Sequence, residues 1–159
     1  MTNFFDAQTV DIIIRLGMAL VFGMFIGTER ILAHKTAGMR TYALVAMGSA
    51  LFIIVSIIVT SSFSDTTVFD PMRMAAQIVS AAGFICAGLV FVRKDGITGL
   101  TSSAGLWVSV GIGMACGFGL FKLALIGTIF TLFIFIVLWF VEASFKKSRF
   151  FRQIDNQKD

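Results

Sequence analysis

Long stretches without a charged side chain are the feature that most constrains how this chain can fold. Four of them run through the sequence, at residues 41–64, 74–92, 96–121 and 123–141. Each can hold a helix of roughly 20 residues, the length that crosses about 30 Å of hydrocarbon. Backbone groups in lipid must be hydrogen-bonded within the segment itself, so these stretches predict membrane-spanning helices. The alternating segments of about ten residues that are typical of a porin-like barrel do not occur.

A further helix is expected near the N-terminus, although charges interrupt it. Only 13 residues separate Arg15 from Glu29, so a spanning helix must carry Arg15 into the membrane or let it reach the surface. Asp11 precedes Arg15 by one helical turn and can pair with it. Arg15 is therefore interpreted either as a packing residue neutralised by Asp11 or as a charge that faces a polar cleft.

We predict an all-α fold, a polytopic bundle of five transmembrane helices. Composition agrees, because 57% of the residues are hydrophobic and there is a single proline. One transmembrane domain is expected over residues 1–145, followed by a basic and aromatic tail at 146–159. The N-terminus carries acidic rather than basic residues before the first apolar stretch, unlike a cleavable signal peptide. The expected helices are residues 10–27, 42–60, 74–92, 102–120 and 123–141.

Lysine and arginine are distributed unevenly between the two ends of these helices. Ten of the 13 fall in the loop after the first helix, the loop after the third helix and the tail, whereas Arg73 and Lys122 lie on the opposite side. The excess of basic residues on cytoplasmic loops places the N-terminus outside and the tail in the cytoplasm. The tail is expected to contact anionic lipid headgroups. The net charge of +4 then reports topology, and nucleic-acid binding is not expected.

Small residues at helical spacing predict where helices pack closely. The fourth helix has two such rows, one through Gly105 and Gly113 and one through Trp107 and Gly111, so we expect it to lie centrally. Two rows also favour a homo-oligomer, for which we expect a dimer. Cys86 and Cys116 lie in apolar stretches and are expected to be packing residues rather than a disulfide. The predicted packing glycines are Gly23, Gly27, Gly83, Gly88, Gly105, Gly113 and Gly117.

Four segments together resemble the MgtC/SapB family of bacterial membrane proteins. They are GMFIGTER, AGMRTYALVAMGSALF, DPMRMAAQIVSAAGFICAGLVF and GITGLTSSAGLWVSVGIGMACGFG, in that order between about Gly23 and Gly119. Ala81, Cys86 and Ser102 depart from the family pattern, each by one small residue for another. Some members append a cytoplasmic domain of ACT-like fold; this sequence has only a short tail there, so roles that need that domain are not expected. The candidate functional residues are Arg15 and the motif residues Glu29, Arg30, Arg40, Thr41, Arg73, Gln77 and Thr101.

The resemblance implies an integral protein of the bacterial plasma membrane that is connected with growth at low magnesium. The family is often described as magnesium transporters. Members have also been linked to restraint of the ATP synthase through membrane contacts. The resemblance thus implies a role in magnesium homeostasis and leaves two mechanisms open, transport of the ion and regulation of another membrane protein.

The residues themselves favour a regulator that binds other membrane proteins over a cation transporter. Mg²⁺ sheds water reluctantly and prefers carboxylate oxygens, yet Asp11, Glu29 and Glu142 all fall near the ends of the predicted helices. Asp65 and Asp70 could hold a hydrated cation, but two carboxylates in a loop are a weak pattern. Apart from Mg²⁺, no cofactor is expected.

Catalysis is not expected, because no serine, threonine or cysteine in the predicted spans has a histidine or aspartate partner. Glu29, Arg30, Arg40 and Arg73 are candidates for one polar network. Thr41 is placed to cap the second helix.

Overall fold

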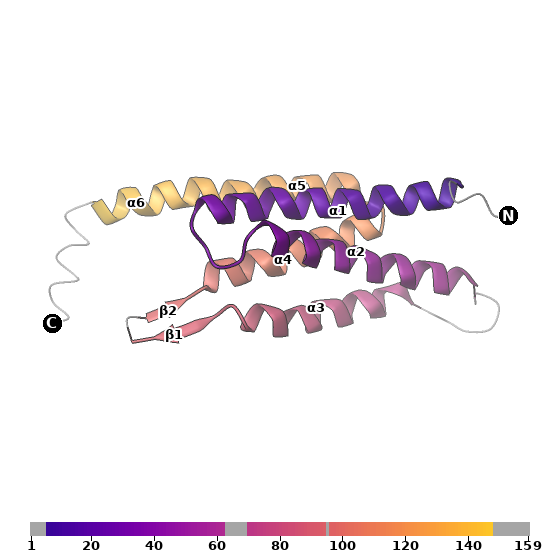
Figure 1. Cartoon of the computed structure of the whole chain (residues 1–159), viewed down its shortest axis with the longest axis horizontal. Coiled ribbons are helices and arrows are strands. Elements are labelled where there is room, and N and C mark those ends of the chain that lie inside the picture. Colours follow the sequence, from indigo (N-terminus) through magenta and orange to yellow (C-terminus); the bar gives the residue numbers. More distant parts are fainter. Residues whose placement is uncertain (1–5, 63–69, 95, 148–159) are drawn as a thin grey trace.

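Five helical rods form the body of the molecule in the computed structural model, which describes residues 6–62, 70–94 and 96–147. Four rods are single helices, α1 (Ala7–Leu32), α2 (Met39–Ser62), α3 (Pro71–Ala87) and α4 (Leu100–Gly117). The fifth is continuous and comprises α5 (Phe121–Phe133), a π-helical segment (Ile134–Leu138) and α6 (Trp139–Lys147). Between α3 and α4 the strands β1 (Phe91–Arg93) and β2 (Gly96–Thr98) pair antiparallel, with Val92 opposite Ile97. Figure 1 shows the rods lying side by side along one axis.

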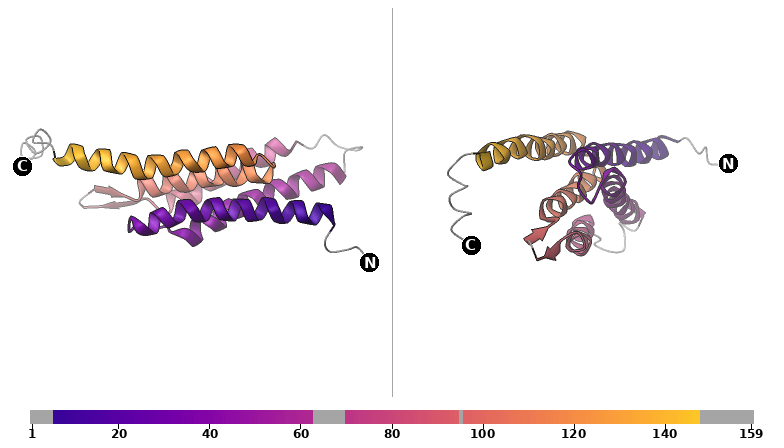
Figure 2. Two further views of the ribbon diagram at one scale, coloured as in Figure 1. Left: turned by 90° about the horizontal axis from the view of Figure 1, so that it is seen from above. Right: turned by 60° about the vertical axis from the view of Figure 1, so that its left-hand side comes forward.

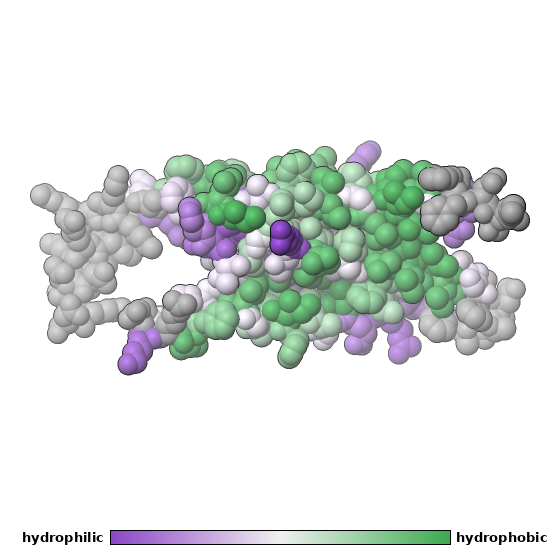
Figure 3. All heavy atoms as spheres, in the orientation of Figure 1, coloured by the Kyte–Doolittle hydropathy of each residue, from purple (hydrophilic) through white to green (hydrophobic). Residues whose placement is uncertain are grey.

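The rods have the length and apolar character of membrane spans. Helices α1, α2 and α4 and the stretch Phe121–Glu142 are each long and apolar enough to cross a bilayer, and α3 is a shorter apolar helix of 17 residues. Apolar side chains cover most of the face seen in Figure 3, with a few separate groups of hydrophilic side chains among them. The prediction of a five-helix transmembrane bundle is therefore confirmed.

Helix α4 is the centre of the bundle. It contacts α1, α2, α3 and α5, and in Figure 2 it lies between the α1 and α5 side of the molecule and α3. Of the 18 residues of α4, 61% are buried. In the most apolar part of the stretch Phe121–Glu142 the share is 22%. The central position predicted for this helix is confirmed, and the other rods leave large apolar surfaces facing outward.

The third helix ends earlier than the uncharged stretch predicted. It was expected to reach residue 92 but stops at Ala87, and the hairpin of β1 and β2 extends from that end of the bundle. Gly96 and Gly99 have φ angles of 126° and 89°, which glycine adopts readily and which interrupt helical geometry. A Cβ on Gly99 would also overlap the carbonyl oxygen of Leu89. An uncharged stretch therefore does not distinguish a helix from a short apolar hairpin.

Other helix ends also differ from the predictions. Helix α2 begins at Met39, so Thr41 lies within its first turn and does not cap it. The last rod continues past the predicted end at residue 141 through Glu142 to Lys147. Its final turns extend past the other helices (Figure 1). Most of the predicted tail lies outside the described residues.

Candidate functional site

The last turns of α1 carry a buried ion pair against an aromatic ring. Arg30 is 3% exposed, and its Nε donates to Oε2 of Glu29, whose side chain is 15% exposed. The guanidinium carbon of Arg30 also lies 3.5 Å from the centroid of the Phe135 ring. A guanidinium over an aromatic face is attracted by the ring quadrupole, and more strongly where water is excluded. Arg30 is therefore neutralised and packed inside the bundle.

Phe135 reaches Arg30 because two neighbouring elements make room for it. It belongs to the π-helical segment Ile134–Leu138, a departure from α-helical geometry that is frequent at functional sites. On its other side the ring lies against Gly105 of α4, where a Cβ would overlap the ring carbon Cζ of Phe135. Glycine at position 105 is thus what allows the ring to lie between α4 and the guanidinium of Arg30.

Tyr42 joins the same cluster from α2. Its side chain is fully buried, its hydroxyl donates to the carbonyl oxygen of Ser102 at 2.8 Å, and that hydroxyl lies beside Gly105. Ser109 Oγ donates to the carbonyl oxygen of Tyr42 at 3.3 Å. The hydroxyl of Ser103 donates to the carbonyl oxygen of Cys86 at 2.7 Å, which connects α4 to α3. Every helical rod therefore contributes to one polar cluster near this end of the bundle.

Arg15 makes a comparable connection at the opposite end. Its Nε lies 2.7 Å from Oδ2 of Asp11, and its Nη1 donates to the carbonyl oxygen of Gly117 at 2.8 Å. Gly117 is the last residue of α4, where unpaired carbonyl groups and the helix dipole favour a positive charge. Of the two interpretations of Arg15, this geometry supports the packing role. It also leaves a shallow hollow of about 140 Å³ beside Asp11 and Arg15.

The remaining motif residues do not join the Glu29 and Arg30 cluster. Arg40 and Thr101 are exposed, and Thr41 is half-buried. Arg73 and Gln77 are exposed in the first half of α3, which begins at the end of the bundle opposite the last turns of α1. The prediction of one polar network is therefore wrong for the set Glu29, Arg30, Arg40 and Arg73. Helix α3 runs antiparallel to α2, and this places Arg73 at the far end of the bundle.

Five of the seven predicted packing glycines lie at close contacts between helices. Cβ atoms on Gly23 and Gly27 would approach the backbone of α2 to 2.6 and 2.5 Å, and Gly105, Gly113 and Gly117 face Phe135, Ala46 and Ala50. Gly83 and Gly88 differ from the prediction. Gly83 is exposed with nothing within 4 Å of its Cβ position, because α3 turns Ala75, Ala82 and Cys86 to the bundle instead. Gly88 follows the end of α3 and lies nearest to the carbonyl oxygen of Ile85 in its own helix.

Of the two candidate cation ligands in the second loop, the structure describes Asp70. Asp65 lies outside the described residues, and the carboxylate of Asp70 caps α3 by accepting from the backbone N–H of Met72 at 2.8 Å. Among residues 6–62, 70–94 and 96–147 there is no group of three or more histidine, cysteine, aspartate or glutamate side chains that could hold a metal ion.

Sequence reasoning missed two central residues of the buried cluster, Tyr42 and Phe135. Tyr42 is the only tyrosine in the chain and directly follows Arg40 and Thr41. Its place beside these motif residues was a signal that it could belong to the site. Phe135 is one of 18 phenylalanines and lies in the run LFIFIVLWF, which reads as a lipid-facing surface. Nothing in that run distinguishes the one ring that turns inward.

Comparisons with known proteins agree in placing most of this chain in one family. The MgtC family profile matches residues 16–144. A protein named "Putative magnesium transporter YhiD" from Escherichia coli K12 is 43% identical over 132 residues, covering 80% of this chain and 60% of the relative. "Protein SapB" of Bacillus subtilis is 41% identical, covering 77% and 54%, and "Protein MgtC" of Brucella abortus is 42% identical, covering 72% and 46%. This chain thus spans about half the length of these relatives. No solved structure matches it.

Proposed function

This chain belongs to the MgtC family, and from that premise we propose that it serves magnesium homeostasis by binding and regulating other membrane proteins. The proposal includes a location in the bacterial plasma membrane and a role without catalysis. It also includes self-association, for which a dimer is the expected state.

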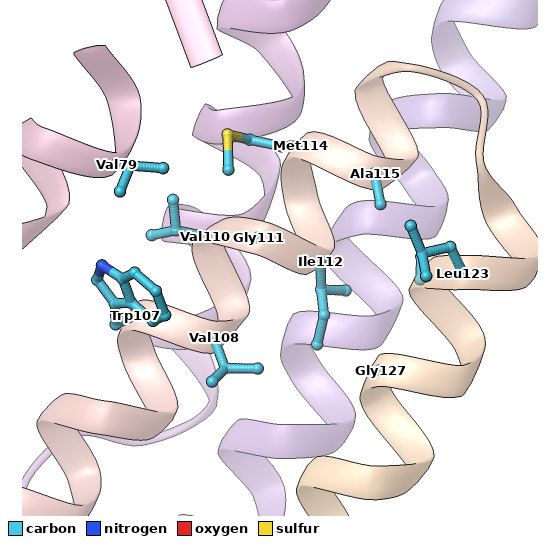
Figure 4. Close-up of a pocket in the computed structure, with 11 residues that line it drawn as sticks. Val79, Trp107, Val108, Val110, Gly111, Ile112, Met114, Ala115, Leu123 and Gly127 are labelled. Carbon is cyan, nitrogen blue, oxygen red and sulfur yellow. The ribbon is translucent and has the colours of Figure 1, made fainter. Parts of the chain in front are cut away.

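An open groove on α4 is the observation that carries this proposal. The groove, here the α4 groove, has a volume of about 270 Å³ and is lined from three helices. Val79 of α3 and Leu123 of α5 flank the exposed Trp107 and Gly111 of α4 (Figure 4). A Cβ on Gly111 would meet nothing within 4 Å. Small residues that are not already covered let another helix approach closely within a bilayer.

The charges inside the bundle support the same proposal. Arg30 is bound by Glu29 and Phe135, and Arg15 by Asp11 and the end of α4. Charged side chains that are paired in this way hold helices together, so they are not available to bind an ion that crosses the membrane. A regulator needs such a rigid body, on which an outward-facing surface can be presented.

Transport of Mg²⁺ is the alternative, and two observations favour it. One relative is named a putative magnesium transporter, and the hollow beside Asp11 is lined by further oxygen-bearing side chains, Gln8 and Ser61. Against it, the carboxylate of Asp11 lies 2.7 Å from Arg15, and a cation in the hollow would be repelled by the guanidinium. The regulator therefore remains the better-supported function.

A flux assay on the purified protein in proteoliposomes separates the two functions. With a Mg²⁺ indicator inside the vesicles, we expect uptake no faster than in vesicles without protein. Saturable uptake that depends on the protein would overturn the regulator as the primary function. The assay requires no knowledge of the partner.

A variant in the α4 groove tests where a partner binds. Gly111→Leu fills open space, so we expect unchanged melting temperature in detergent but loss of growth at low Mg²⁺ in a bacterial strain that depends on this protein. Gly17→Leu is the matched control, because a Cβ on Gly17 also meets nothing within 4 Å and it lies away from the groove. Full growth with Gly111→Leu would contradict this assignment of the surface. Light scattering on both variants reports whether the groove also joins two copies.

A further inference from the structure

A second groove, separate from the α4 groove, runs between α2 and α3. This α2–α3 groove has a volume of about 400 Å³, within the range of about 300–1,000 Å³ that is usual for small-molecule sites. Its lining is almost entirely apolar. On the α2 side it includes Leu44, Gly48 and Phe52, and on the α3 side Gln77, Ala81 and Ile85.

The groove is elongated along the helices. Helices α2 and α3 run in opposite directions (Figure 1), so Leu44 lies towards the same end as Ile85, and Phe52 towards the end where α3 begins. The lining residues of α3 extend from Met74 to Ile85, about 16 Å at the helical rise of 1.5 Å per residue. At its middle, a Cβ on Gly48 would meet nothing within 4 Å. A long, narrow, apolar groove of this kind fits a hydrocarbon chain.

Gln77 adds a polar group to this apolar lining. It is exposed and lies less than two turns from Pro71, the first residue of α3. An amide that faces hydrocarbon without a hydrogen-bond partner is costly. At this depth, near one end of a short helix, a suitable partner would be the ester oxygens that join the acyl chains of a phospholipid to glycerol.

Arg73 supplies the matching charge one helical turn closer to the membrane surface. Arg73 and Gln77 are four residues apart and so share a face of α3, and Arg73 is exposed in the first turn of the helix. Hydrophilic side chains gather over this part of α3 on an otherwise apolar lower face in Figure 3. A guanidinium binds phosphate oxygens in a bidentate manner. The order from surface to interior is therefore cation, amide and apolar groove.

We infer that the α2–α3 groove binds a membrane phospholipid, with its phosphate on Arg73, its ester groups near Gln77 and one acyl chain in the groove. This order of groups is that of a phospholipid from headgroup to tail. A second copy of the chain fits less well. A symmetric contact places the same surface patch of both copies against each other, so two exposed Arg73 side chains would add like charges to an otherwise apolar interface.

Native mass spectrometry of the protein in a maltoside detergent tests this inference with dioleoylphosphatidylglycerol as the probe. We expect the wild-type chain to retain one phosphatidylglycerol, and to retain dioleoylglycerol, which lacks the phosphate, much more weakly. Arg73→Gln removes the phosphate contact and Gly48→Leu fills the groove. Each should raise the apparent dissociation constant about tenfold, as the loss of one charged hydrogen bond or of an apolar site predicts.

Three control variants make the result specific to this groove. Lys122→Gln removes an exposed basic residue close to the start of α5, and Gly17→Leu and Gly111→Leu place the same side chain in open space elsewhere. All three should retain the lipid like the wild type. If Gly48→Leu and Arg73→Gln retain the lipid as well as the wild type, the inference is overturned. It is also overturned if the control variants lose the lipid to the same extent. If Gly48→Leu dissociates a dimer but retains the lipid, the groove binds a second copy of the chain instead.

Discussion

At the scale of single residues, the two arginines within α1 are held by groups of the chain itself. Arg15 is hydrogen-bonded to the last carbonyl group of α4, and Arg30 is enclosed by Glu29 and Phe135. A charge in a membrane helix is costly and therefore suggests function by default. Here each arginine connects α1 to other helices, and its cost is offset by the contacts it makes.

Glu29→Gln is expected to lower stability. It leaves the buried Arg30 with a neutral amide oxygen in place of its counter-charge, and hydrogen bonds between charged groups are worth about 1.5–3 kcal/mol, more than neutral ones. The melting temperature in detergent should fall, as measured by scanning fluorimetry. Glu142→Gln is the control, because Glu142 is exposed on α6. Unchanged melting of Glu29→Gln together with lost growth at low Mg²⁺ would instead indicate a transport site.

The sequence predicted the residues of the site better than their arrangement. Glu29, Arg30 and Arg15 were identified, and the structure gives each a specific contact. Arg40, Thr41 and Thr101 lie outside the buried cluster, and Arg73 and Gln77 lie on another helix near the opposite end. Spacing along one helix predicts which residues share a face, but which helix covers that face depends on packing across the bundle. The inward turn of Phe135 depends on Gly105 of α4, 30 positions earlier in the chain.

At the scale of elements, α4 presents one packed face and one open face. Gly113 lies against the carbonyl group of Ala46, where a Cβ would overlap the oxygen atom, whereas Gly111 faces open space. The two glycines are two residues apart and point to different sides of the same helix. Spacing alone predicted both rows of small residues, and only the structure shows which of them is covered within one chain.

Gly113→Ala and Gly111→Ala form a matched pair that tests this difference. Gly113→Ala must push α2 away and is expected to destabilise the protein by about 1–3 kcal/mol, as overpacking does. Gly111→Ala should be neutral or stabilising by up to about 1 kcal/mol, since alanine favours helix. Denaturation with increasing dodecyl sulfate, followed by circular dichroism, measures both. Equal stability of the two variants would contradict the close approach of α4 to α2.

Helix number was predictable, whereas helix ends were not. Charge-free stretches predicted four of the five rods, and the span around Arg15 predicted the fifth. The hairpin of β1 and β2 was missed because its apolar residues Phe91, Val92 and Ile97 look like the end of one helix and the start of the next. The positive φ angles of Gly96 and Gly99 belong to the hairpin and to the residue before α4, after α3 has already ended at Ala87.

At the scale of the whole molecule, five rods place the beginning of α1 and the end of α6 at opposite ends (Figure 1). The distribution of lysine and arginine predicts which end faces the cytoplasm. This orientation predicts that helix α3 begins on the outer side, together with Arg73 and the end of the α2–α3 groove near it. It also predicts that the hairpin and the cluster around Arg30 lie on the cytoplasmic side.

Labelling of introduced cysteines tests this orientation. Ser62 at the end of α2 and Lys94 in the hairpin turn are both exposed, whereas the native Cys86 and Cys116 are buried and give little background. In intact cells, a maleimide that cannot cross the membrane should label Ser62→Cys but not Lys94→Cys. After lysis it should label both. The reverse pattern in intact cells would show that the orientation is inverted.

The π-helical segment Ile134–Leu138 has a consequence for everything that follows it. Such a segment holds one residue more than an α-helical turn, and one residue corresponds to about 100° around a helix. The side chains of α6, including the edge-to-face pair of Trp139 and Phe140, are therefore rotated by about that angle from where an unbroken α-helix would place them. A deletion of one residue here would restore the α-helix and turn α6 as a whole, although no residue of α6 had changed. The direction in which α6 faces is decided five residues before it begins.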